Sequence, residues 1–254
     1  MIVKAEAVAL RVDPFSRTSL LVSWLTREHG RLVTLAKGAQ RPRSDFRGQM
    51  DVFYTCEIVY YSATRSGLST LKECAAIEPR QALRQRIQAS ACASYLCDLV
   101  QRLTPLGSPQ ETLYPFVSGI LDALCDRQAD GPQRLLHWAE LKLMGLLGMA
   151  PRLERCTACG RHAGPDEPLT VIAVPRGGVV CAGCRPTSDE PLIPLDRGAM
   201  AILRAWQSTS TPGPARRLVC SPEQRAGIEK ALGALLTYHL DYSPGRQIAL
   251  SLLS

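Results

Sequence analysis

Residues 52–61 read VFYTCEIVYY, and this stretch indicates a β-strand with one buried face and one half-exposed face. Its even positions are apolar or nearly so, whereas its odd positions are mixed, as alternating side chains of a half-buried strand require. Three β-branched, apolar runs precede it at residues 2–12, 18–26 and 31–36, and a shorter run follows at 68–74. Five strands in roughly 75 residues, mostly without a helical period between them, favour a small closed barrel.

The chain beyond Pro79 has a different pattern, in which apolar residues recur at 83, 87, 91, 95, 99 and 103 along one stripe of a helix. Further helices are expected at 111–127, 133–148, 197–207 and 221–242, with a short strand at 170–174 and a loop at 208–214. At the last helix, Ser221 is a candidate N-cap, Pro222 suits the first position and Gln224 completes a capping box. The fold class predicted is α+β: a five-stranded barrel followed by a mostly helical domain.

Two cysteine pairs interrupt the helical part. Cys156 and Cys159 form one CxxC motif, Cys181 and Cys184 form another, and 21 residues separate them. Two tight turns of this kind can bring four thiolates around one ion, an arrangement that suits Zn²⁺. Four protein ligands leave no open position, so we expect one structural zinc ion per chain. An iron centre with the same ligands, or four free thiols, remain the alternatives.

Composition points to a globular protein with polyanionic partners. The 254 residues include 46% hydrophobic and 21% charged residues, and the formal net charge is +7. No run approaches the roughly 18 consecutive apolar residues of a membrane span. Residues 1–15 also lack the uninterrupted apolar core of a signal peptide, so we expect a cytoplasmic protein. In that compartment ten cysteines argue against disulfides, and we expect the six outside the two pairs to be core residues.

A basic segment joins the third and fourth expected strands. Single-strand binders combine phosphate-neutralising cations with aromatic side chains on which bases stack. The cations expected to contact nucleic acid are Arg31, Lys37, Arg41, Arg43 and Arg47. The aromatic candidates are Phe53 and Tyr61, with Tyr54 on the opposite face. Solvated surface charge and edge packing of the rings are the alternatives.

Catalytic signatures are missing from the sequence. No Gly-Lys dipeptide occurs, so there is no Walker A loop and we expect no nucleotide partner. The H-x-E and P-C-x-x-C motifs of zinc deaminases are also absent. We therefore expect a binding protein and no enzyme.

Three stretches resemble the RecO family of recombination mediators, and they occur in order along essentially the whole chain. They are TREHGRLVTLAKGA at 26–39, LLGMAPRLERCTACG at 146–160 followed by GGVVC at 177–181, and YHLDYSPG at 238–245. The resemblance implies an OB-fold domain at 1–79, a helical domain in two parts at 80–155 and 191–254, and a zinc module at 156–190. After Gly245 the chain departs from the family, since it lacks the Lys-Ser that members often carry near the end.

The resemblance also implies function. Family members bind single- and double-stranded DNA, anneal complementary strands without ATP, work with RecR and help load RecA on gapped DNA at the nucleoid. They also contact the acidic C-terminal tail of the single-stranded-DNA-binding protein, for which family position suggests Arg134 and His137 here, with plain helix surface as the alternative for both. The alternative is an RNA-binding protein of translation or ribosome assembly with the same OB-fold and zinc-ribbon parts.

Overall fold

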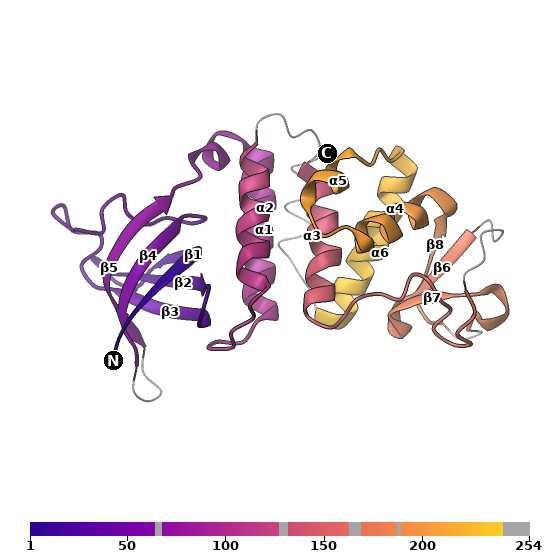
Figure 1. Cartoon of the computed structure of the whole chain (residues 1–254), viewed down its shortest axis with the longest axis horizontal. Helices are drawn as coiled ribbons and strands as arrows, with labels where there is room; N and C mark the ends of the chain where they lie inside the picture. Colours follow the sequence, from indigo (N-terminus) through magenta and orange to yellow (C-terminus); the bar gives the residue numbers. More distant parts are fainter. Residues whose placement is uncertain (64–67, 127–131, 163–168, 187–188, 241–254) are drawn as a thin grey trace. The chain divides into compact units, whose positions relative to one another are not determined.

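The computed structural model describes residues 1–63, 68–126, 132–162, 169–186 and 189–240 (Figure 1). The chain divides into two compact units, Met1–Gln128 and Ala129–Ser254. Within the described ranges, no helix combines the length and apolar character needed to cross a bilayer.

The first unit is built around a closed barrel of five strands in the order β1-β2-β3-β5-β4. The β3 and β5 strands pair in parallel, and all other neighbours, including β4 and β1, pair antiparallel. This is the OB-fold arrangement, so the predicted fold class is confirmed. The strands are β1 (Ile2–Pro14), β2 (Leu20–Thr26), β3 (Gly30–Ala36), β4 (Thr55–Tyr61) and β5 (Ser69–Glu78).

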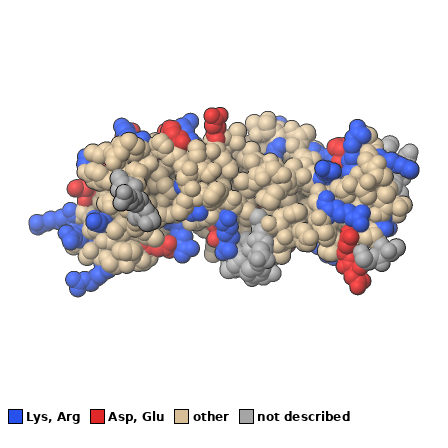
Figure 2. All heavy atoms as spheres, turned by 90° about the horizontal axis from the view of Figure 1, so that it is seen from below, with Lys and Arg blue, Asp and Glu red and all other residues tan. Residues whose placement is uncertain are grey.

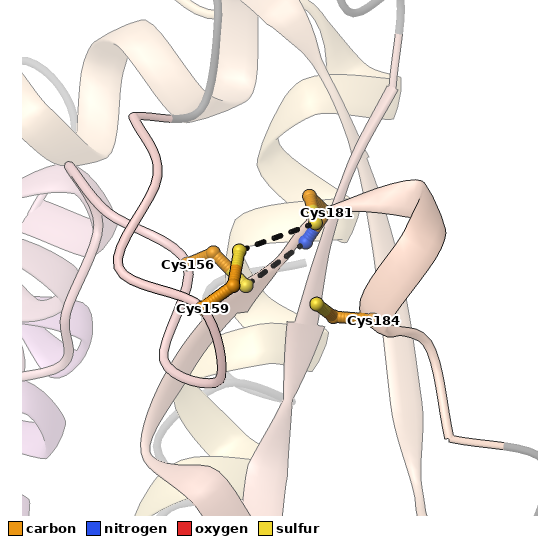
Figure 3. Close-up of side chains that lie close together, drawn as sticks. All are labelled: Cys156, Cys159, Cys181 and Cys184. Atoms are coloured by element: carbon orange, nitrogen blue, oxygen red, sulfur yellow. Dashed lines mark hydrogen bonds between the residues drawn. The ribbon is translucent and has the colours of Figure 1, made fainter.

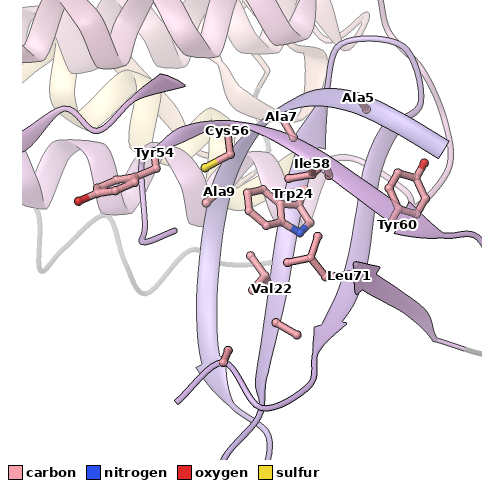
Figure 4. Close-up of a cluster of buried hydrophobic side chains, with 12 residues drawn as sticks. Ala5, Ala7, Ala9, Val22, Trp24, Tyr54, Cys56, Ile58, Tyr60 and Leu71 are labelled. Atoms are coloured by element: carbon pink, nitrogen blue, oxygen red, sulfur yellow. The ribbon is translucent and has the colours of Figure 1, made fainter. Parts of the chain in front are cut away.

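The barrel interior is filled by side chains from every strand (Figure 4). Trp24 is fully buried near its centre, where Val22, Ile58 and Leu71 converge on it. The indole Nε1 donates a 2.9 Å hydrogen bond to Thr34 Oγ1, which satisfies the polar atom that burial would otherwise leave without water.

Arg80 joins the barrel to the helices that follow it in the same unit. Its side chain is buried and donates to Phe53 O at 2.6 Å and Thr55 Oγ1 at 2.9 Å on the barrel side. On the helix side it donates to Ser118 Oγ at 2.8 Å and Asp122 Oδ1 at 2.7 Å. These contacts tie α2 to the start of β4. The helical elements are η1 (Gln81–Gln85), α1 (Ile87–Leu103) and α2 (Leu113–Cys125).

The second unit combines helices with a three-stranded antiparallel sheet of order β7-β6-β8. Trp138, Trp206 and Leu235 are buried in it, from three different helices. The elements are α3 (Pro132–Leu146), β6 (Leu169–Ala173), η2 (Val174–Arg176), β7 (Gly178–Val180), η3 (Ala182–Cys184), β8 (Leu192–Asp196), α4 (Arg197–Ser208), α5 (Pro212–Arg217) and α6 (Pro222–Leu240).

Several predicted boundaries were wrong. The β4 strand begins at Thr55, and Phe53 precedes it with a positive φ of 71°. The turn expected at Asp13-Pro14 is strand, since β1 continues to Pro14. The loop expected at 208–214 overlaps α5, and β7 and β8 were not predicted. The first helix is preceded by a separate 3₁₀ turn, so α1 begins at Ile87.

The capping box at the start of α6 is confirmed. Gln224 N donates to Ser221 Oγ at 3.2 Å, and Ser221 N donates to Gln224 Oε1 at 3.0 Å. We expect Ser221→Ala to lower the free energy of unfolding by about 1 kcal/mol, because an N-cap acceptor is lost. Urea denaturation measures this, with Ser221→Asp as the variant that keeps an acceptor. Equal losses in both variants would argue against the cap.

Candidate metal centre and nucleic-acid interface

The first cysteine pair lies on a tight turn that begins at Cys156. Gly160 N donates to Cys156 O at 2.9 Å, and Cys156 N donates to Arg161 O at 2.7 Å. Gly160 has a φ of 73°, which is the left-handed conformation that glycine adopts without strain. The backbone therefore folds back so that Cys156 and Cys159 face the same side (Figure 3).

The second pair follows β7 directly and is held against the first. Cys184 N donates to Cys181 O at 3.0 Å, which closes the turn of η3. Thr157 N donates to Val179 O at 2.8 Å and so connects the first turn to β7. Cys181 N approaches Cys156 Sγ at 3.4 Å. The strand thus sets the position of one pair relative to the other.

The four sulfurs fit a metal ion. Their Sγ atoms all lie within 4.8 Å of one another, and Cys159 Sγ lies 3.8 Å from Cys181 Sγ (Figure 3). Zinc–sulfur distances of about 2.3 Å in a tetrahedral site place the sulfurs roughly 3.8 Å apart. The cluster of Cys156, Cys159, Cys181 and Cys184 is therefore close enough to hold a metal ion. Because all four ligands come from the protein, such a site is structural.

The thiols of this cluster do not share one electrostatic environment. Burial disfavours the Cys156 thiolate, but backbone N–H groups of Cys159, Cys181 and Ala158 overcome this and lower its pKa to about 6. Hydrogen bonding with the Cys181 and Cys159 side chains raises the pKa of Cys184 to about 12. Four neighbouring thiols cannot all ionise unless a cation offsets their repulsion, which is what a divalent metal supplies.

The other cysteines occupy different environments. Cys56, Cys92 and Cys97 are buried, and burial raises the pKa of Cys97 to about 12, as expected for core thiols. Cys74, Cys125 and Cys220 are half-buried. His162 is exposed beside the first cysteine turn and is not part of the metal cluster.

The segment between β3 and β4 presents four exposed cations. Lys37, Arg41, Arg43 and Arg47 are all exposed, and none forms an ion pair within the described ranges. The only acidic residue among residues 37–50 is Asp45. We call residues 37–50 the basic loop. Figure 2 shows Lys and Arg side chains projecting from the surface of the barrel unit.

The basic loop is a shaped segment. Successive turns are closed by hydrogen bonds from Arg41 N to Gly38 O at 3.0 Å and from Ser44 N to Arg41 O at 3.1 Å. At its far end, the Gln49 side-chain Oε1 accepts from Ala76 N of β5 at 3.1 Å. Phe46 and Met50 pack against the barrel core. The cations are therefore held on a folded surface.

Arg31 differs from the other cations that the sequence singled out. It lies on β3, half-buried, and its Nε donates to Thr104 O at 2.9 Å. Burial lowers its pKa. Its main interaction is therefore with the segment that follows α1.

The aromatic candidates do not accompany the basic loop. Phe53 is buried with only 6% exposed, and Tyr54 is buried with 8% exposed, so neither face is available to a base. Tyr61 is 45% exposed, but it is the last residue of β4, and the basic loop precedes the other end of that strand. Sequence reasoning placed Phe53 on a half-exposed strand face because it extended β4 by three residues.

Two other exposed residues lie beside the basic loop and were not predicted. Phe15, 59% exposed, and Arg17 sit in the turn between β1 and β2. Gln40 N of the basic loop donates to Thr18 O in that turn at 3.0 Å. An aromatic residue and an arginine within a turn between two strands were the available signal.

The partner-binding candidates on α3 have different exposures. Arg134 is half-buried, and its Nη1 donates to Leu218 O at 3.3 Å. His137 is 1% exposed and its Nδ1 lies 3.2 Å from Glu140 Oε2, which is equally buried. His137 therefore cannot touch a partner in this structure.

Comparisons with known proteins agree across nearly the whole chain. The family model described as Recombination protein O N terminal matches residues 1–80, and Recombination protein O C terminal matches residues 84–246. A DNA repair protein RecO from Pelotomaculum thermopropionicum is 31% identical over 242 residues, covering 94% of this chain and 89% of the relative.

Two further relatives carry the same name. DNA repair protein RecO from an Anaeromyxobacter species is 31% identical over 249 residues, covering 97% of this chain and 93% of the relative. The one from Symbiobacterium thermophilum is 31% identical over 234 residues, covering 91% and 89%. The chain therefore belongs to the RecO family of DNA repair proteins, which supports a role in recombination as a mediator.

Proposed function

We propose that this protein binds single- and double-stranded DNA through the basic loop of its OB-fold and anneals complementary strands without nucleotide hydrolysis. The observation that carries the proposal is the set Lys37, Arg41, Arg43 and Arg47, exposed and without ion pairs in the described part of the chain. Cations left unpaired by the protein are available to phosphates.

Annealing follows from charge neutralisation. Two DNA strands repel each other through their phosphates, and a basic surface that neutralises both lowers this barrier. Base pairing then supplies the driving force, so no reaction has to be catalysed. In this proposal the loop positions strands by their backbones and leaves their base edges free to pair.

In this proposal, Arg31 and Phe53 do not contact DNA and His137 does not contact a protein partner. The Arg31 side chain donates to Thr104 O, and the other two residues are buried. Tyr61 remains a candidate for a second, separate contact. The barrel domain at 1–79 would carry DNA, and the helical parts at 80–155 and 191–254 would carry partners.

Zinc is the metal we propose for the four cysteines, since thiolate ligands in a tetrahedral arrangement suit it. Cys156, Cys159, Cys181 and Cys184 would hold it, one ion per chain. Bound there, the ion would cross-link the two cysteine turns of the 156–190 module and take no part in DNA chemistry.

The partners are those that the family resemblance implies. RecR would act with this protein, and together they would help RecA load on gaps coated by the single-stranded-DNA-binding protein, in the cytoplasm at the nucleoid. Arg134 is the remaining candidate for contacting that protein's acidic tail. Its side chain donates to Leu218 O, and the residue before Leu218, Arg217, is exposed and could contact the same tail.

Strand annealing tests the proposal. We expect purified protein without ATP to speed pairing of two complementary oligonucleotides, and to do so also when one strand is coated by the single-stranded-DNA-binding protein. The acceleration should fall steeply between about 50 and 200 mM salt, since phosphate neutralisation is its cause. Free oligonucleotides at low salt, unbound and unpaired, would contradict the proposal.

RNA binding is the second candidate, because OB-folds that hold single strands by charge and stacking are used on both nucleic acids. Competition between single-stranded DNA and RNA of equal length and sequence separates the two. Preference for RNA would favour a function in translation or ribosome assembly over one in DNA recombination.

A further inference from the structure

The turn between β1 and β2 carries an exposed aromatic ring, and this turn is hydrogen-bonded to the basic loop. Phe15 is 59% exposed, whereas phenylalanine side chains in proteins are usually buried. The turn that carries it is closed by hydrogen bonds from Phe15 N and Ser16 N to Ser19 O, at 2.9 and 3.2 Å. The ring is therefore presented on an ordered backbone.

The same turn is attached to the basic loop at two points. Gln40 N donates to Thr18 O at 3.0 Å, and Gly38 N donates to Ser19 Oγ at 3.3 Å. Lys37 and Arg41 flank these contacts in sequence, and the Arg41 side chain folds over Gly38. The turn that carries Phe15 is thus held against the basic loop by direct hydrogen bonds.

Exposed cations lie on the turn that carries Phe15 and on the loop bonded to it. Arg17, two residues along the turn, is exposed and forms no ion pair within the described ranges, as is also true of Lys37 and Arg41. An exposed aromatic flanked by unpaired cations is the combination that proteins use to hold single strands, since the cations bind phosphates and the ring stacks on a base. An apolar partner, which carries no negative charge, would gain no affinity from these cations.

We infer that Phe15 is a base-stacking residue that makes the barrel prefer single-stranded nucleic acid to duplex. This inference rests on the proposed function, because it needs the phosphate contacts of the basic loop. A base in a duplex is covered by its neighbours, whereas an unpaired base can lie on the ring. Phe15 then adds affinity only where a free base is available.

The experiment compares two probes of equal length and equal phosphate number. One is an oligothymidylate and the other a strand of abasic residues. We expect Phe15→Ala to weaken binding of oligothymidylate about tenfold, the order that one stacked base contributes, and to leave the abasic strand and a duplex bound as before. Val219→Ala is the matched control, because Val219 is an apolar residue, 82% exposed, in the other compact unit.

A tryptophan at this position gives a direct readout. Trp24, Trp138 and Trp206 are all buried, so the exposed indole of Phe15→Trp is the one that a bound base can reach. We expect this variant to restore affinity, and its fluorescence to be quenched by oligothymidylate but not by the abasic strand.

The outcomes separate the two claims. If the wild-type protein binds neither probe, the proposed function fails and the inference fails with it. If wild type binds both but Phe15→Ala matches it on oligothymidylate, only the stacking role is overturned. Equal loss on both probes would also overturn it, since the ring would then act through the fold.

Discussion

Replacing Lys37, Arg41 and Arg43 together by glutamine should weaken binding to single-stranded DNA by on the order of 100-fold at about 50 mM salt. These three cations are exposed and unpaired in the described chain, so their loss removes phosphate contacts without breaking an ion pair within the fold. Strand annealing should fall with binding, because in this mechanism neutralisation of the strands is what promotes pairing.

The salt dependence gives a second, independent measure of the same contacts. Each phosphate neutralised on a single strand contributes about 0.7 to the slope of log affinity against log salt. Loss of three contacts should therefore reduce that slope by about 2. Fluorescence anisotropy with a labelled oligonucleotide across a salt series measures both the slope and the affinity.

A control with the same net charge separates local contact from overall attraction. Arg217, Arg225 and Lys230 lie on α5 and α6, are exposed, and form no ion pair within the described ranges. Replacing these three by glutamine removes as much charge from the other unit. If both triple variants lose affinity equally, DNA binding follows net charge and the basic loop has no special part.

Features set by local sequence were predictable. Alternation located the barrel strands, and the Ser221–Gln224 capping box was correct because its hydrogen bonds join residues three positions apart. Strand β7 was missed because three residues are too few to show a period, and β8 was missed because it contains Pro194, which argues against a strand. The α5 helix contains two prolines and a glycine, which favour a loop, yet Trp206 Nε1 donates to Ala215 O at 3.2 Å and holds it in place.

The candidate sites also divide into those that depend on local sequence and those that depend on the rest of the fold. Cysteine spacing is local, so the metal cluster could be predicted before the distances were known. Which way a ring points depends on the rest of the fold: Phe53 is turned inward by a backbone with positive φ, and its carbonyl is held by buried Arg80. The case for Phe15 depends on a contact between segments more than twenty residues apart, because Gln40 N of the basic loop donates to Thr18 O in the turn that carries Phe15.

Loss of the metal should have the largest effect on stability. We expect Cys181→Ser to abolish stoichiometric zinc and to lower the melting temperature of the second unit by about 10 °C or more, because structural zinc contributes directly to folding. Cys181 Sγ lies 3.8 Å from Cys159 Sγ, the Cys181 N–H donates to Cys156 Sγ, and within the described ranges no fifth Cys, His, Asp or Glu belongs to the cluster. Metal analysis and thermal unfolding followed by circular dichroism measure the two effects.

Cys220→Ser is the matched control, since Cys220 is a half-buried thiol of the same unit that lies outside the metal cluster. It should keep one zinc per chain and a melting temperature close to that of the wild type.

The four ligands and the basic loop belong to different compact units, so below its melting temperature Cys181→Ser should bind oligonucleotides within about twofold of wild type. Retention of one zinc per chain in Cys181→Ser, with unchanged melting, would show that these sulfurs do not form the site. A large loss of DNA affinity in a folded, zinc-free variant would instead mean that the metal module contributes to the nucleic-acid surface.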